Sequence, residues 1–259
     1  MHRTLRTAAL TAALLTTTGS AAHALVFAEK SPEQKLRADI GKQTYGYLKC
    51  LGKALVACEK TGTTAGPECT VENGVATGTA DPKNKFAAAV AKCAAKLDFA
   101  RKTPRGLTSQ QGYQLLGCPS YGLGFEFSGL EQYAQFLELA KPFVDSSVSN
   151  MPLIAGCTDA KSCANAAKVL LDFLDALGRC RLTCEDDYKN KKGNGGPTDD
   201  PVQCSGSGDV NVQTCRTRAT NAFLKKAKAW PFANAVLPGI SPVVDQLGDE
   251  LWNTPDQCG

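Results

Sequence analysis

Histidine is scarce in this sequence, and export would remove both copies. Residues 1–24 have the form of a secretory signal peptide, with early arginines, an apolar run and the small-residue exit Ala22-His23-Ala24. Cleavage after Ala24 would discard His2 and His23 and leave a mature chain of 235 residues. Without histidine that chain lacks the usual general base, the usual activator of a nucleophile and the commonest zinc ligand. We therefore predict a protein that is not an enzyme and needs no cofactor.

Long apolar runs and a strong excess of either charge are also missing. The apolar part of the signal is far shorter than the roughly 20 residues that a membrane-spanning helix needs, and no later stretch is both longer and uncharged. We expect no transmembrane segment in the mature chain. Removing two signal-peptide arginines from the 29 basic residues leaves 27 against 25 acidic ones, a net charge of +2. This balance gives no reason to expect nucleic acid as a partner.

Cysteine is abundant, but the Cys-x-x-Cys spacing is absent. The two closest cysteines are Cys180 and Cys184, four positions apart. Zinc ribbons, thioredoxin-like sites and covalently attached haem all require the tighter spacing. All 12 cysteines follow the signal peptide, and an even number in an exported chain is typical of a disulfide framework. The sequence predicts a secreted protein, periplasmic or extracellular, whose cysteines are structural.

What the chain does contain is alanine- and lysine-rich sequence with helical periodicity and no convincing series of alternating strand segments. We predict an all-α, disulfide-stapled helical bundle in which residues 25–259 form a single domain. Two helical hairpins, within residues 31–101 and 158–229, would flank a central helical segment. The organising helix runs from Ser162 to Cys184, where three cysteines share an apolar stripe with core residues at Cys163, Ala166, Leu170, Phe173, Leu177, Cys180 and Cys184.

Capping residues predict where the two helices of the first hairpin begin and where the first one ends. Ser31-Pro32 followed by Gln34 predicts a helix start, and Thr61-Gly62 predicts its end. Asp81-Pro82 predicts the start of the second helix. In an antiparallel pair of helices the simplest nested disulfides join Cys58 to Cys69 and Cys50 to Cys93.

The second hairpin repeats this distribution of cysteines, two on the first helix, one in the loop and one on the second helix. The same nesting predicts the disulfides Cys184 to Cys204 and Cys180 to Cys215. Cys157 and Cys163 are close enough to clip the turn before the long helix, which leaves Cys118 to pair with Cys258. A duplicated helical unit is a hypothesis that rests on this cysteine order alone.

Two further boundaries are predicted from prolines. Pro142 lies within the apolar stripe of the central segment and should kink or end its helix. Ser241-Pro242 predicts the start of one more helix near the carboxyl end. Before Pro142, residues 120–125 form an aromatic loop that could line a pocket or simply cover the core.

The remaining candidates for metal binding or catalysis are carboxylates. An acidic cluster around a glycine-rich loop could bind Ca²⁺ through Asp186, Asp187, Asp199 and Asp200, although a solvated polar loop is the favoured interpretation. A carboxylate-dependent glycoside hydrolase would need no histidine, and glutamates border the aromatic loop at Glu126, Glu131 and Glu138. Basic residues between Arg216 and Lys228 could contact an anionic surface or form an ordinary exposed helix face.

One part of the chain suggests a family. The run from Lys49 to Leu55, with Cys58, Cys69 and Ala91-Lys92-Cys93, resembles cysteine-rich, alanine- and lysine-rich helical segments of uncharacterised secreted proteins from Gram-negative bacteria. The resemblance covers residues 33–98 and implies a non-enzymatic exported protein. It assigns no functional residue.

These observations predict a non-catalytic structural or interaction protein of the cell envelope or exterior, acting on an unknown protein or envelope component. The alternative is a carrier that holds a small apolar ligand between helices. A glycoside hydrolase is the remote alternative.

Overall fold

A computed structural model describes seven segments of the chain: residues 32–61, 69–78, 85–102, 130–157, 159–190, 210–230 and 232–253. These segments form six helices and one short hairpin, so the predicted all-α class is confirmed. The helices are α1 (Pro32–Thr61), α2 (Lys85–Lys102), α3 (Leu130–Ile154), α4 (Ala160–Asn190), α5 (Val210–Ala227) and α6 (Ala233–Asn253). The strands are β1 (Val71–Glu72) and β2 (Val75–Ala76). Within the described segments no helix is long and apolar enough to span a bilayer.

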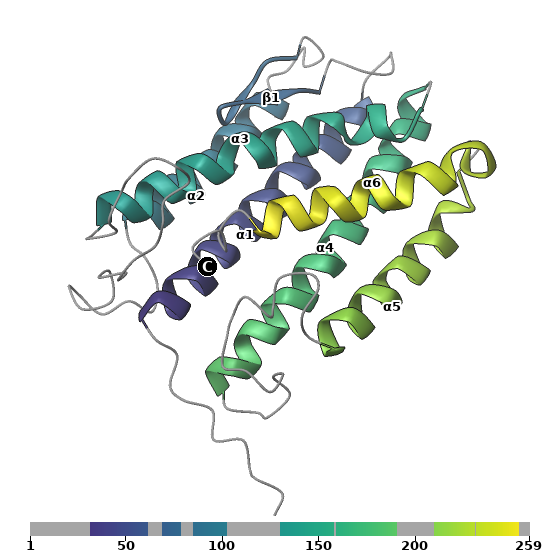
Figure 1. The fold of residues 1–259 in the computed structure, drawn as a ribbon. Helices are drawn as coiled ribbons and strands as arrows, with labels where there is room; N and C mark the ends of the chain where they lie inside the picture. Colours follow the sequence, from purple (N-terminus) through teal and green to yellow (C-terminus); the bar gives the residue numbers. More distant parts are fainter. Residues whose placement is uncertain are drawn as a thin grey trace, which may run out of the picture.

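The two longest helices, α1 and α4, form the most extensive helix contact and run side by side through the molecule (Figure 1). Helices α2 and α3 pack on α1, and α5 and α6 pack on α4. The close approach of α1 and α4 needs a glycine, because a Cβ on Gly52 would lie 2.4 Å from Leu171 Cδ1. The predicted stripes form the buried core, including Leu51 on α1 and Leu170 on α4.

Several predicted helix boundaries are confirmed. Helix α1 begins at Pro32 and ends at Thr61. Helix α4 includes the whole of the predicted organising run and continues past Cys184 to Asn190. The predicted cap at Asp81-Pro82 lies outside the described residues, which resume with α2 at Lys85.

The prediction that a helix starts at Ser241-Pro242 is wrong, because α6 begins at Ala233 and passes through both Pro238 and Pro242. The carbonyl of Phe232 accepts the first N–H bonds, from Ala235 and Val236. Both prolines are exposed, so water can bond to the carbonyls that they leave without a donor. The same holds for Pro142, which is exposed and does not end α3. Burial of a continuous stripe at Ala233, Ile240 and Val244 favours one helix over two.

Within the described residues, the two halves of the chain share an order of helices. In each half a long helix of 30 or 31 residues is followed by one of 18 and then by one of 25 or 21. The third helices carry the same motif, Pro142-Phe143-Val144-Asp145 in α3 and Pro242-Val243-Val244-Asp245 in α6. In both copies the third residue of the motif, Val144 or Val244, is buried. The hypothesis of a duplicated unit therefore extends to three helices in each half.

The β-hairpin is an element that the sequence analysis missed. Val71 pairs with Ala76 and Glu72 with Val75 in antiparallel register. The turn between them is Asn73-Gly74, and both residues have positive φ, 50° and 74°. Asn-Gly between valines is the usual signal of a tight two-residue hairpin, so the sequence did carry the information.

Candidate functional site

Four disulfides hold the described part of the chain together: Cys50–Cys93, Cys58–Cys69, Cys157–Cys163 and Cys180–Cys215. Three of these pairs are the ones that nesting predicts, and Cys157–Cys163 is the predicted clip before the long helix. Cys50–Cys93 joins α1 to α2, and Cys180–Cys215 joins α4 to α5 in the same way, with Cα separations of 5.7 and 5.6 Å. The predicted pairs Cys184–Cys204 and Cys118–Cys258 include residues outside the described part.

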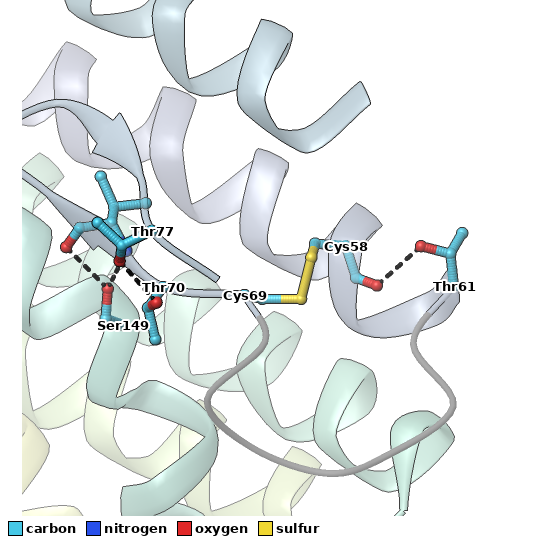
Figure 2. The surroundings of a disulfide bond; sticks show 7 residues. Cys58, Thr61, Cys69, Thr70, Thr77 and Ser149 are labelled. Atoms are coloured by element: carbon cyan, nitrogen blue, oxygen red, sulfur yellow. Dashed lines mark hydrogen bonds between the residues drawn. A yellow bond between two sulfur atoms is a disulfide. The ribbon is translucent and has the colours of Figure 1, made fainter. Parts of the chain in front are cut away.

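Cys58–Cys69 fixes the β-hairpin to the end of α1 (Figure 2). At that end the Thr61 hydroxyl donates to the carbonyl of Cys58 at 2.9 Å. On α3, Ser149 Oγ accepts the Val71 N–H at 2.8 Å and donates to the Val71 carbonyl at 3.3 Å. The hairpin is therefore a cross-linked bridge between α1 and α3 and not a mobile arm.

Among the described residues the most buried carboxylate is Asp145 of α3, which is 1% exposed and lies beneath this hairpin. It accepts hydrogen bonds from the Tyr47 hydroxyl and from the Gly74 N–H, each at 2.7 Å. Burial raises the pKa of Asp145, while the bonds from Tyr47 and Gly74 and the charge of Lys141 oppose the rise. Burial also raises the pKa of Tyr47, and the bond to Asp145 raises it further. Both carboxylate oxygens of Asp145 accept hydrogen bonds from groups of the fold, which leaves neither free for acid–base chemistry.

A second polar cluster joins α1 to α4. Asp175 accepts hydrogen bonds from Tyr45 and forms ion pairs with Lys49 at 3.2 Å and Arg179 at 2.7 Å. Burial raises the pKa of Asp175, but the donors Tyr45 and Lys49 and the positive charges outweigh it and hold that pKa below its usual value. Burial, with the bond to Asp175, raises the pKa of Tyr45 to about 12. This cluster is also structural.

Among the described residues, a groove of 590 Å³ lies between α1 and α2. Its walls include Tyr47 and the Cys50–Cys93 disulfide, and its rim carries two lysines. The full lining is Gln43, Gly46, Tyr47, Cys50, Lys92, Cys93, Ala95, Lys96, Leu97, Phe99 and Ala100. No acidic side chain belongs to it. The sequence analysis did not anticipate this groove.

The predicted carboxylate sites remain predictions. Asp186 and Asp187 fall within the last turns of α4, but their side chains, and all of Asp199 and Asp200, lie outside the described residues. No metal-binding cluster occurs among the side chains that the structure does describe. Of the three glutamates, Glu138 forms an ion pair with Arg101, and the side chains of Glu126 and Glu131 are not described.

The basic stretch of α5 is partly used within the molecule. Arg216 pairs with Asp245 of α6, and Lys226 pairs with Asp172 of α4, at 2.7 and 2.8 Å. These pairs hold α5 against its neighbours. They favour the interpretation as an ordinary exposed helix face.

Fold and site define the chain as a disulfide-cross-linked helical-bundle protein with an open groove on one side. Comparison with protein-family models, curated proteins and solved structures finds no match. The resemblance of residues 33–98 to helical secreted proteins therefore stays a prediction. Function has to be argued from the geometry.

Proposed function

We propose that this protein is an exported, non-catalytic binding protein that acts through its surface on a protein or envelope component. The observation that carries the proposal is the set of four disulfides joining helices and turns of the described chain. Such bonds persist in an oxidising compartment, outside the cytoplasm. They keep the surface in one shape, which lowers the entropic cost of binding.

The buried polar groups support a role without catalysis. Among the described residues, Asp145 and Asp175 each have several partners, and these partners are groups of the fold itself. Neither carboxylate lines the groove. A catalytic acid or base needs a free position facing a substrate.

Exposed apolar side chains are the natural candidates for contact with a partner. Phe143 and Val243 occupy equivalent positions of the repeated motif in α3 and α6, and they are 50% and 44% exposed. A photo-cross-linking residue placed at either position, in protein exported by the source organism, should yield a discrete adduct. The matched control is the exposed Lys168 of α4. Adducts from position 168 alone, or from none, would contradict the proposal.

The groove between α1 and α2 favours a second candidate, a carrier of a small apolar ligand. Its 590 Å³ is within the range of about 300–1,000 Å³ typical of ligand pockets. A fluorescent fatty-acid dye should bind the disulfide-intact protein saturably at one site and be displaced by unlabelled fatty acid. A protein that binds no dye would rule out the carrier.

A further inference from the structure

We infer that the groove between α1 and α2 selects an anionic amphiphile, a single-chain fatty acid whose carboxylate lies between Lys92 and Lys96. The apolar tail would lie along Leu97, Phe99 and the ring of Tyr47. This inference rests on the carrier candidate and names its ligand class. Charge complementarity is the reason for choosing this occupant.

The two lysines form a pair of like charges. They are one helical turn apart on α2, both are exposed, and both line the groove. Like charges at this spacing repel and destabilise a helix. No acidic side chain belongs to the groove lining, so the lining itself offers Lys92 and Lys96 no carboxylate. A carboxylate bound between them would relieve that repulsion.

Gly46 keeps the groove open. It lies inside α1, where glycine is less stable than alanine, and a Cβ built on it meets nothing within 4 Å. Gly52, by contrast, is required by the close approach of Leu171. No packing contact of the described chain therefore requires glycine at position 46, and a larger side chain there would project into the space that a ligand would fill.

The groove is also held in shape before a ligand arrives. The Cys50–Cys93 disulfide is part of its lining and sets the distance between α1 and α2, with the two Cα atoms 5.7 Å apart. Cys93 is buried, while Cys50 is half-buried. A bound tail would cover this bond, which provides a local measure of occupancy.

The test of anion recognition compares decanoate with decanol, which share a tail, on the disulfide-intact chain by calorimetry. Decanoate should bind about tenfold more tightly, because two rim charges contribute on the order of 1.4 kcal/mol together. The double variant K92Q/K96Q should lose this preference and keep its affinity for decanol. The control K168Q/K225Q removes two exposed lysines elsewhere and should keep the preference. Equal binding of the two ligands by the unmodified chain would overturn anion recognition and leave the carrier intact, whereas binding of neither would overturn both.

The location is tested by filling the groove. Gly46→Leu should abolish binding of both ligands while the thermal midpoint stays level or rises. Gly239→Leu, at another exposed helix glycine with open space around it, should leave binding unchanged. On the unmodified chain, decanoate should slow reduction of Cys50–Cys93 and leave Cys180–Cys215 unaffected. Full binding by folded Gly46→Leu, or reduction of both bonds at unchanged rates, would overturn the assignment to this groove.

Discussion

Single residues hold this molecule together through buried polar contacts. Asp145 of α3 gathers a hydroxyl from α1 and a backbone N–H from the β-hairpin, and so joins three elements at one point. Burying a carboxylate costs free energy unless its oxygens are bonded, and here each oxygen has a donor. Asp175 of α4 likewise joins α1 to α4, and it forms ion pairs with Lys49 and Arg179.

Loss of the Tyr47 hydroxyl should destabilise the fold. Tyr47→Phe keeps the ring but leaves one oxygen of buried Asp145 without its donor, so the free energy of unfolding should fall by about 1–3 kcal/mol. Tyr45→Phe is the matched control, since Asp175 retains Lys49 and Arg179. Urea denaturation measures both, and equal losses in the two variants would be inconsistent with a special role for Asp145.

Acid should weaken the cluster around Asp175. The pKa of Asp175 is lower in the folded than in the unfolded chain, so its ionised form stabilises the fold above about pH 4. That contribution is lost as the pH falls through the folded-state pKa. The stability difference between the natural chain and Asp175→Asn should therefore be full at pH 7 and shrink below about pH 4. A difference that is constant down to acid pH would exclude this linkage.

Among the elements, close approach of helices depends on small residues. Gly52 lets α1 meet Leu171 of α4, and Gly248 of α6 lies close to Leu177 of the same helix. Helices α1 and α6 thus both approach α4 closely at a glycine. The extensive α1–α4 contact follows from this spacing.

A methyl group at position 52 should disturb that contact. Gly52→Ala places a Cβ where Leu171 Cδ1 would be 2.4 Å away, and overpacking of this kind lowers stability by about 1–3 kcal/mol. Gly46→Ala, in the same helix but in open space, should be neutral or stabilising. Adding Leu171→Val to Gly52→Ala should recover part of the loss. Thermal unfolding of the three variants tests this, and a cost that Leu171→Val does not reduce would place the strain elsewhere.

Helices are the part of this fold that sequence predicts well, because capping residues and apolar periodicity are local. Ser31-Pro32 marks the start of α1, and its stripe at Leu51 is buried as expected. The prediction from Pro242 was wrong, since a proline on an exposed face can lie inside a helix that tertiary packing stabilises.

The groove was not predicted for another reason. The spacing of Lys92 and Lys96 is visible in the sequence, but a groove lining without acidic side chains, among the described residues, depends on which helix packs beside α2.

On the scale of the whole molecule, disulfides join elements that are far apart in the chain. Cys50–Cys93 closes a sequence separation of 43 residues, whereas Cys157–Cys163 closes only 6. A cross-link restricts the unfolded chain more when it closes a longer loop. The long bonds between helices therefore matter most for stability.

The loss of stability on removing one disulfide should increase with the length of the loop that it closes. Replacing both cysteines of Cys50–Cys93 by alanine should lower the free energy of unfolding by about 4 kcal/mol, against about 2 kcal/mol for Cys157–Cys163. Denaturant titration of the two double variants gives the comparison. The reverse order would mean that the short clip acts through the native state rather than through loop closure.

The most direct measurement is disulfide mapping of the natural protein by mass spectrometry of unreduced peptides. The account predicts peptides that link Cys50 to Cys93, Cys58 to Cys69, Cys157 to Cys163 and Cys180 to Cys215, in a mature chain that begins after Ala24. Free thiols at these positions, or a bond between the two cysteines of α1, would contradict the cross-linked frame on which the proposed function depends.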